Sequence, residues 1–297
     1  MTANGQFILG IDGGGTKTLA RLVNIDSQQS WQIAGGASSL TNNLVEAGQV
    51  VAKLIDALCA QAGCAPVQVH AMLGLAGAGS AMRVAQLQHH LPRCGSMHIS
   101  TDATTSLYGA GQGEPVCIVA LGTGSVAARL NPDGSQILQG GWGFIAGDEG
   151  GGARLGLHGL QHLLADIDRY AQPRSRLSQC LAERVAKQRD EMLGWIAEAK
   201  AGDYAALAPL VLELHESCPA AQQVMQQHLR QVEQMIYDIR GDSGYPVALL
   251  GGLAAATARG LPANMSAMLI APKGDALDGA CYLARRQAKG ERWWVSK

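Results

Sequence analysis

The sequence predicts an α/β protein made of two domains, and three observations support this fold class. Short apolar runs typical of buried strands alternate with longer segments that carry apolar residues at helical spacing. The chain has 297 residues, of which 47% are hydrophobic and 16% are charged, so it can bury more than one core. A glycine–threonine turn followed by Ala-Arg-Leu occurs at residues 13–28 and again at 121–136. The spacing along the chain between these two copies is far longer than a solenoid repeat of about 20–50 residues. It therefore favours two related domains, with chance similarity as the alternative.

The first half has the pattern of strands followed by crossover helices. Three glycines at 13–15 stand between two strand-like runs, so we expect them to join strand to strand. A helical pattern begins at Leu44 and ends at Gly63, a typical stop signal. The expected elements of this half cover residues 7–12, 18–26, 31–36, 44–63, 69–79, 81–91 and 97–101.

The second half begins with strands and continues with helices. Residues 115–143 contain three strand-like pieces separated by Gly-rich and Asp-Gly turns. The segment 150–240 carries apolar stripes and few strand formers, which indicates helices. A strand and loop at 245–258 and a helix at 275–288 follow. No linker rich in Pro, Ser or charge marks a boundary, so the pattern alone defines the domains. The expected domains are residues 1–112 and 113–297.

The composition excludes several classes of partner. Lys and Arg (23) nearly balance Asp and Glu (24), so no sequence-wide positive field is available to hold nucleic acid. The seven cysteines are an odd number without a CxxC pair, which is typical of reduced thiols in a cytosolic chain. No run approaches the roughly 20 apolar residues needed to cross a bilayer, and no secretory leader pattern is present. We therefore expect a cytoplasmic protein that binds neither nucleic acid nor membrane.

The stretch IDGGGTKT, residues 11–18, matches neither common nucleotide fingerprint. A P-loop needs a glycine before its lysine, and GxGxxG needs a glycine where Thr18 stands. Successive glycine N–H groups can instead converge on phosphate oxygens, with the hydroxyls of Thr16 and Thr18 as further donors. The alternative is a tight hairpin that uses its glycines only for positive φ and leaves the lysine solvated. The candidate phosphate-binding residues are Gly13, Gly14, Gly15, Thr16 and Lys17.

A second turn of the same kind, LGTGS at 121–125, raises the likelihood of phosphate binding over the hairpin alternative. Two such turns can clamp a polyphosphate, and the second set consists of Gly122, Thr123 and Gly124. Asp12 precedes the first turn and would then hold Mg²⁺ through water, because magnesium keeps part of its hydration shell. The alternative for Asp12 is a turn-forming residue that caps its own loop.

Three further carboxylates stand where chemistry is expected. Asp102 lies between a strand end and a helix start, where it is either an N-cap or a base that accepts a hydroxyl proton in phosphoryl transfer. The glycine-rich segment 140–156 contains Trp142, Asp148 and Glu149. An aromatic face beside carboxylates suits a polyhydroxylated ligand, whereas an ordinary loop would pack Trp142 on the core.

Six segments in this order resemble the sugar kinase, Hsp70 and actin ATPase superfamily. They are GIDGGGTKT, LTNN, STDATTS, LGTGS, GGWGFIAGDEG and LLGGLAAA. Within the superfamily the chain is most similar to the BadF/BadG/BcrA/BcrD ATPase group, which contains N-acetylglucosamine kinase. The resemblance spans roughly residues 7–160 and 245–288. It implies two RNase H-like (actin-like ATPase) domains with a cleft between them that closes on ATP and a sugar.

The resemblance also implies roles for individual residues. Asp102 matches the base that takes the proton from the sugar 6-hydroxyl. The residues that match sugar ligands are Asn42, Gly141, Trp142, Gly143 and Asp148. The two glycine turns match phosphate-binding segments, and Gly251 with Gly252 matches the pair that flanks adenosine. The alternative for this last pair is a buried strand that meets a small-residue helix.

The sequence thus favours an ATP- and Mg²⁺-dependent kinase that phosphorylates the 6-hydroxyl of glucosamine or N-acetylglucosamine. It does not choose between the two sugars. The alternative is a BadF-type ATPase that couples ATP hydrolysis to a partner enzyme, although no cysteine stands in a segment that matches cluster ligands. The zinc motif CxCGxxGC of ROK sugar kinases is absent. A homodimer through the helical half is a further expectation.

Overall fold

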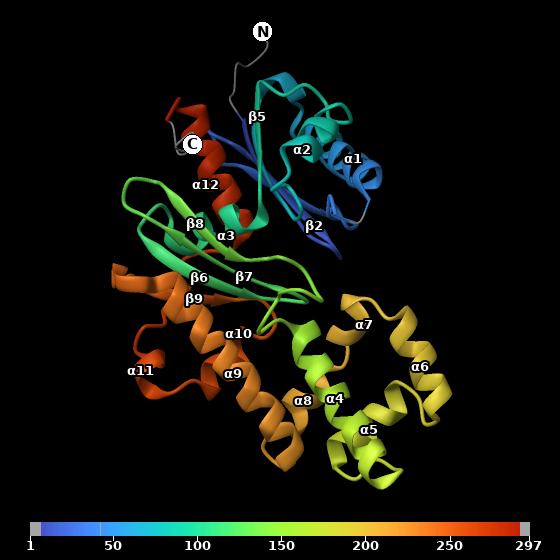
Figure 1. Ribbon diagram of the computed structural model, residues 1–297. Helices are drawn as coiled ribbons and strands as arrows, with labels where there is room; N and C mark the ends of the chain where they lie inside the picture. Colours follow the sequence, from blue (N-terminus) through green and yellow to red (C-terminus); the bar gives the residue numbers. More distant parts are fainter. Residues whose placement is uncertain (1–6, 42, 292–297) are drawn as a thin grey trace. The chain divides into compact units, whose positions relative to one another are not determined.

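The computed structural model describes residues 7–41 and 43–291 and shows two compact units (Figure 1). The first unit takes residues up to Val116, the segment Arg129–Gln136, and the chain from Ala271 onward. The second takes Cys117–Ala128 and Ile137–Ile270.

The first unit is built on a five-stranded sheet with the order β3-β2-β1-β4-β5. Its strands are β1 (Phe7–Gly13), β2 (Thr18–Asn24), β3 (Ser30–Gly35), β4 (Val69–Leu75) and β5 (Ser96–Ser100). β1 pairs antiparallel with β2 and parallel with β4, so Gly13 lies opposite both Thr18 and Leu75. The expected strand-to-strand connection through glycines 13–15 is confirmed.

Helices cover both faces of this sheet. They are α1 (Leu44–Ala62), α2 (Ala81–Gln88), α3 (Asp102–Gly111) and α12 (Ala276–Ala288), with a 3₁₀ turn η1 (Pro66–Gln68). α1 and α2 share a core with alternate residues of β1, including Leu9 and Ile11. Since side chains alternate along a strand, Gly10 and Asp12 face the other side, where Gly10 approaches Cys281 of α12.

The helix α12 belongs to the first unit, although the sequence pattern placed residues 113–297 in a second domain. α12 packs against α3 and β1 because glycines at the contact let backbones approach closely: a Cβ on Gly10 would lie 2.6 Å from the Cys281 sulfur. A Cβ on Gly279 would meet the backbone of α3. This long-range packing leaves no composition signal, and the domain boundary near residue 112 stays a prediction.

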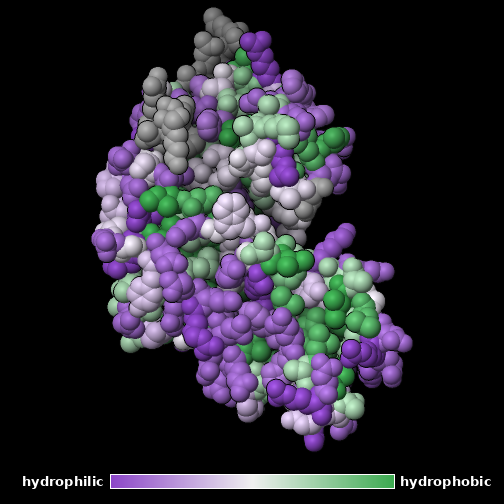
Figure 2. Space-filling view, viewed as in Figure 1, coloured by the Kyte–Doolittle hydropathy of each residue, from purple (hydrophilic) through white to green (hydrophobic). Residues whose placement is uncertain are grey.

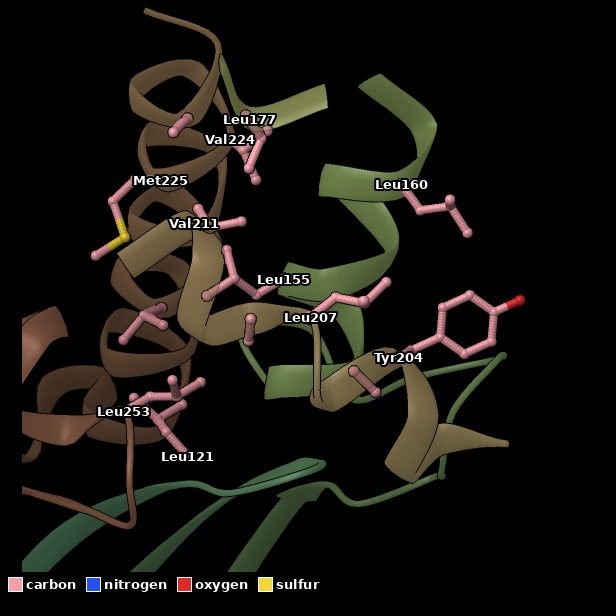
Figure 3. Close-up of a cluster of buried hydrophobic side chains, with 14 of the residues drawn as sticks. Leu121, Leu155, Leu160, Leu177, Tyr204, Leu207, Val211, Val224, Met225 and Leu253 are labelled. Carbon is pink, nitrogen blue, oxygen red and sulfur yellow. The ribbon is translucent and has the colours of Figure 1, made fainter. Parts of the chain in front are cut away.

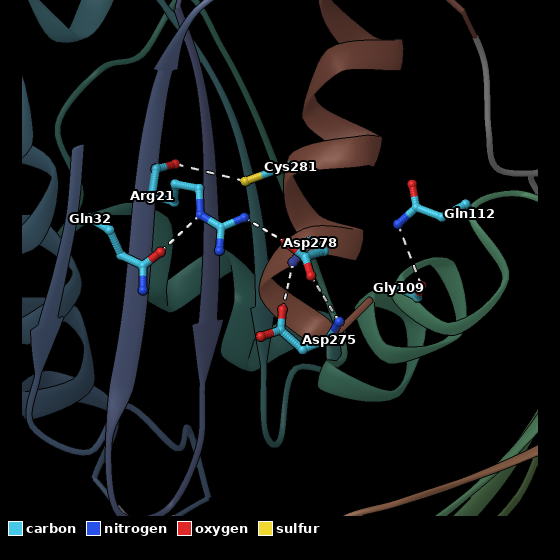
Figure 4. Close-up of polar contacts among 7 residues, drawn as sticks. All are labelled: Arg21, Gln32, Gly109, Gln112, Asp275, Asp278 and Cys281. Atoms are coloured by element: carbon cyan, nitrogen blue, oxygen red, sulfur yellow. Dashed lines mark hydrogen bonds and ion pairs between the residues drawn. The ribbon is translucent and has the colours of Figure 1, made fainter. Parts of the chain in front are cut away.

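An ion pair fixes α12 on the sheet (Figure 4). The Arg21 guanidinium donates to Asp278 at 2.5 Å and to the Gln32 side chain at 2.9 Å. Asp278 in turn forms a reciprocal capping box with Asp275, in which each carboxylate accepts the other residue's backbone N–H. The first turn of α12 is therefore held from the side of β2.

The second unit contains the sheet with the order β8-β7-β6-β9. Its strands are β6 (Val116–Leu121), β7 (Ser125–Leu130), β8 (Gln136–Gly140) and β9 (Val247–Leu250), and β9 runs parallel to β6. β6 and β7 are neighbours joined by residues 122–124 alone, too few for the crossover that a parallel pair requires. The second glycine turn is thus also a hairpin turn.

The expected helical segment is confirmed. It consists of α4 (Gly152–Tyr170), α5 (Arg176–Arg184), α6 (Arg189–Glu198), α7 (Ala201–Ala205), α8 (Ala208–Leu214) and α9 (Pro219–Arg240). The 3₁₀ turn η2 (Gly241–Ser243) precedes β9, and α10 (Ala254–Gly260) and α11 (Ala263–Ser266) follow it. Leucines such as Leu155, Leu160 and Leu207 pack with Val211 and Val224 in one core (Figure 3).

The surface is mostly hydrophilic on the face shown in Figure 2, where hydrophobic residues gather in scattered groups. Within residues 7–41 and 43–291, no helix is long and apolar enough to cross a membrane.

Candidate functional site

The first glycine turn is fixed by backbone hydrogen bonds that use its carbonyl groups. The Gly13 carbonyl accepts from Ala76 N–H at 2.9 Å, and the Gly14 carbonyl accepts from Ser38 N–H at 3.0 Å. Gly14 N–H donates to the Lys17 carbonyl at 3.1 Å, which closes the turn. The turn therefore has one backbone conformation and presents Lys17 to solvent.

One proposed phosphate donor is excluded by this geometry. Thr18 has no exposed surface, and its hydroxyl is committed to the Gly36 carbonyl at 2.6 Å and the Ser38 hydroxyl at 2.7 Å. Its role is to fasten β2 to the segment after β3, so the prediction of a ligand contact for Thr18 is wrong. Thr16, by contrast, is exposed and keeps its expected role as a candidate.

The glycines of both turns are not there for positive φ. None of the five at positions 13–15, 122 and 124 has a φ in the left-handed region. Gly13 and Gly124 are needed because neighbouring groups crowd their Cα atoms, Leu75 in the first case and the Asp148 carboxyl in the second.

Three glycines, however, have open space where a side chain would stand. A Cβ on Gly14 or Gly122 would lie 3.8 or 3.9 Å from its nearest neighbour, and one on Gly252 would have no neighbour within 4 Å. The fold would accept alanine at these positions. Glycine there leaves the backbone accessible to a ligand, which is the role that the sequence predicts for these positions.

Three carboxylates gather beside the first glycine turn. Asp12 is the last residue of β1 on the face covered by α12. Asp102 is the first residue of α3, and Asp275 is the N-cap of α12. Their mutual repulsion appears in the pKa of Asp12, which burial, Asp102 and Asp275 together raise to about 6, against the opposing charge of Lys17.

The structural alternative for Asp102, an N-cap, is not what the structure shows. The N-cap of α3 is Thr101, whose hydroxyl accepts the Thr104 N–H at 3.2 Å. One carboxylate oxygen of Asp102 accepts the Ala103 N–H at 3.0 Å. Burial raises the pKa of Asp102 despite this backbone hydrogen bond, so the carboxylate is oriented and partly desolvated.

In the second unit, the glycine turn at 122–124 is joined to the start of α4. The first two amides of α4, Gly152 and Ala153, donate to the carbonyls of Gly122 and Thr123 at 2.8 and 2.9 Å. The Ser125 hydroxyl donates to the Glu149 carbonyl at 2.6 Å. The turn is therefore bonded both to the start of α4 and, through Ser125, to the loop that precedes it.

The loop before α4 carries the candidate sugar-binding residues. Trp142 is 84% exposed, so it does not pack on the core. Asp148 is only 9% exposed, yet no hydrogen bond from a described residue reaches its carboxylate. Its φ of 64° lies in the left-handed region, a strained conformation that is often found at functional positions. Gly141 and Gly143 also have positive φ, of 70° and 89°.

The remaining predicted residues are Gly251, Gly252 and Asn42. Gly251 has a φ of 91° and lies against the Leu121 backbone, directly before the second glycine turn. Leu253 N–H donates to the Leu121 carbonyl at 3.2 Å, so the 251–252 pair and the turn at 122–124 are neighbours in the second unit. Asn42 lies outside the described residues.

Sequence reasoning missed Asp275 and Arg154. The D-x-x-D capping box around Asp275 was a readable helix-start signal, but nothing in the sequence connected it to Asp12. Arg154 follows the glycine-rich loop as an ordinary helical arginine.

Within the described residues, no group of three His, Cys, Asp or Glu is arranged to hold a metal ion. A Mg²⁺ site at Asp12 would therefore need phosphate oxygens and water as further ligands, which is usual for this ion.

Comparison with known proteins agrees with the sequence motifs. A sequence profile of the BadF/BadG/BcrA/BcrD ATPase family matches residues 9–267. Glucosamine kinase GspK of Vibrio cholerae is 26% identical over 284 residues, which cover 94% of this chain and 96% of that protein. The crystal structure of a provisionally named N-acetylglucosamine kinase from Chromobacterium violaceum has a TM-score of 0.87 and 33% identity and covers 95% of this chain and 100% of its own.

A more distant structure shares the fold alone. It is a ROK family glucokinase from Streptomyces griseus in complex with glucose and AMPPNP, with a TM-score of 0.51, 15% identity, and coverage of 95% of this chain and 99% of its own. The predicted α/β fold of actin-like ATPases is thus confirmed.

The charge on Asp12 should destabilise the folded protein. Native Asp12 is protonated below about pH 6, whereas the ordinary value is 3.8, so the native state holds the extra proton between these values. Stability conferred by this proton is lost as pH rises from about 4 to 6. Without nucleotide or Mg²⁺, we expect Asp12→Asn to increase the free energy of unfolding at pH 7.5 by at most about 3 kcal/mol, at ~1.4 kcal/mol per pKa unit.

Urea denaturation of both proteins at pH 7.5 and pH 4 would test this. The variant should gain stability over the unsubstituted chain only at the higher pH. An equal difference at both values would mean that the effect does not come from the ionised carboxylate.

Proposed function

The chain belongs to the BadF/BadG/BcrA/BcrD ATPase family, and on this basis we propose that it is an ATP-dependent amino-sugar kinase. The substrate class is supported by relatives named glucosamine kinase and N-acetylglucosamine kinase. We place the transferred γ-phosphoryl group on the 6-hydroxyl of the sugar, which makes the enzyme an ATP:hexosamine 6-phosphotransferase.

The observation that carries this proposal is the pair of partly desolvated carboxylates, Asp12 and Asp102, beside the first glycine turn. Phosphoryl transfer requires little covalent chemistry from the protein. It requires a carboxylate that orients and finally deprotonates the alcohol, and a second charge that holds the metal–phosphate group. The two carboxylates suit these two tasks.

Asp102 would act as the base. The Ala103 N–H fixes one of its oxygens, which leaves the second oxygen to accept a hydrogen bond from the sugar 6-hydroxyl. As the hydroxyl oxygen bonds to the γ-phosphorus, the bond from that phosphorus to the bridging oxygen of the β-phosphate breaks and ADP leaves, while the hydroxyl proton passes to Asp102. Burial raises the pKa of Asp102 and so increases its strength as a base relative to an exposed carboxylate.

The nucleotide would be held mainly by backbone. Its phosphates would contact the two glycine turns together with Thr16, Thr123 and Lys17, through amides other than those of Gly14 and Gly122, which donate to the Lys17 and Gly124 carbonyls. Adenosine would lie against Gly251 and Gly252. Asp12 would bind Mg²⁺ through water, and the ion, when bound, neutralises charge on the phosphates. The open space above Gly14, Gly122 and Gly252 supports these contacts, because the fold itself does not require glycine there.

The sugar would be bound by the loop before α4. The buried carboxylate of Asp148, which has no described donor, can accept hydrogen bonds from two sugar hydroxyls. Trp142 offers an exposed aromatic face, and Gly141, Gly143 and Asn42 would complete the set. Relatives named for glucosamine and for N-acetylglucosamine leave both sugars as candidates. The cytoplasmic location and a homodimer stay predictions.

The direct test is ADP release from Mg-ATP with glucosamine, N-acetylglucosamine, glucose or no sugar. Strong stimulation by one amino sugar, with little by glucose, is the expected result, and it would also identify the substituent at carbon 2. Equal ADP release with and without every sugar would contradict a kinase and support an ATPase that serves a partner enzyme.

Replacing the base should abolish turnover without unfolding the protein. We expect Asp102→Asn to lower kcat by about 10²- to 10⁴-fold, the usual contribution of a general base. The thermal midpoint should be unchanged or higher, since a partly buried charge is removed. Asp133→Asn, in an exposed turn of the same unit, is the matched control and should keep full turnover. Normal turnover in the Asp102 variant would refute the assignment.

The open glycines give a second test. Gly122→Ala should leave the thermal midpoint nearly unchanged but raise KM for ATP about tenfold or more, equivalent to ~1.4 kcal/mol of lost binding. The control is Gly194→Ala in α6, where a Cβ has no neighbour within 4 Å. If both variants bound ATP equally well, the glycine at 122 would have no role in binding.

A further inference from the structure

Arg154 lies in the first turn of α4 and contacts much of the loop that precedes the helix. Its Nε donates to the Gly147 carbonyl at 2.9 Å, and a terminal nitrogen donates to the Ile145 carbonyl at 2.7 Å. The same guanidinium lies 3.7 Å from a Glu149 carboxylate oxygen and 6.0 Å from the centre of the Phe144 ring. One side chain, 19% exposed, thus spans residues 144–149.

Residues 144–147 of this loop make few hydrogen bonds other than those with Arg154. It contains glycines at 140, 141, 143, 147, 150 and 151, and each glycine increases the backbone entropy lost on ordering. Further hydrogen bonds hold the loop, and four of them lie outside residues 144–147: Gly141 to Ser125, Ser125 to Glu149, Gly150 to Gln231 and Gly151 to Asp148. In another, Gly147 N–H donates to the Gly143 carbonyl at 2.8 Å. None of these reaches the carbonyls of Ile145 and Gly147, as Arg154 does.

The contacts of Arg154 lie next to the residues that matter for the sugar. Gly147, whose carbonyl it holds, directly precedes Asp148, which is kept at a strained φ of 64°. A Cβ on Gly147 would lie 3.0 Å from the Trp142 Cβ, so the held segment also packs against Trp142. The backbone at Arg154 is itself fixed, because the preceding residues Gly152 and Ala153 are hydrogen-bonded to the turn at 122–124.

We propose that Arg154 is a positioning residue that orders the sugar-binding loop before the sugar arrives. It binds no substrate itself but fixes Asp148 and Trp142 relative to the turn at 122–124. A lysine cannot replace it, because a single ammonium group lacks the planar fork that reaches two carbonyl groups at once. The expected effect on KM for the sugar rests on the proposed function, whereas the expected effect on the order of the loop does not.

The kinetic test uses Arg154→Lys and Arg154→Ala. Both should raise KM for the amino sugar by about 10- to 100-fold, the loss typical of one or two charge-assisted hydrogen bonds. KM for ATP should change less than about twofold, and guanidinium ion at millimolar concentration should restore part of the sugar affinity of the alanine variant. Arg189→Ala is the control, since that arginine pairs with Asp168 at the surface of the same unit.

An unchanged KM for the sugar, an equal increase in both KM values, or a lack of guanidinium rescue would overturn the proposal. If the alanine variant did not fold, the lysine variant would decide by the same KM comparison.

A structural test needs no sugar. The chain is labelled with 5-fluorotryptophan, and the ¹⁹F resonance of Trp142 is assigned by comparison with Trp142→Phe. In the lysine variant this resonance should shift and narrow because the loop moves more freely, while those of Trp31 and Trp195 stay in place. An unchanged Trp142 resonance would refute the positioning role. A changed resonance in a protein that no sugar stimulates would refute the kinase alone.

Discussion

Close contact between backbones is the constraint on which both halves of the chain depend. In the first unit, Gly10 and Gly279 let α12 approach β1 and α3, and this contact brings Asp275 beside Asp12. In the second, the first amides of α4 bond to the carbonyls of the turn at 122–124. Each helix thereby places its first turn beside a glycine turn, and several of the candidate functional side chains stand at helix starts.

Buried carboxylates have different surroundings in the two units. In the first unit, burial and the charges of Asp102 and Asp275 oppose ionisation of Asp12, so the charged form of Asp12 lowers the stability of this unit. In the second unit, Asp148 is buried without a described donor, and its neighbours are held by the Arg154 guanidinium. Strain at such places is expected where a ligand completes the interactions.

Local patterns in the sequence predicted the strands, the helices and both hairpin turns, because these depend on neighbours within a few residues. What depends on distant contacts was missed or wrong. Thr18 was expected to face phosphate, but its hydroxyl is taken by Ser38, twenty residues away. The return of α12 to the first unit and the proximity of Asp275 to Asp12 also rest on long-range packing. Asp102 and Asp148 were found because their motifs are ordered along the chain, and their roles stay predictions.

The position of the transferred phosphate tests the central claim most directly. After reaction with Mg-ATP and the preferred amino sugar, a ¹H–³¹P correlation spectrum of the product should show phosphorus coupled to the two protons on carbon 6. Phosphorus coupled to the anomeric proton, or inorganic phosphate as the sole product, would contradict a kinase in which Asp102 activates the 6-hydroxyl.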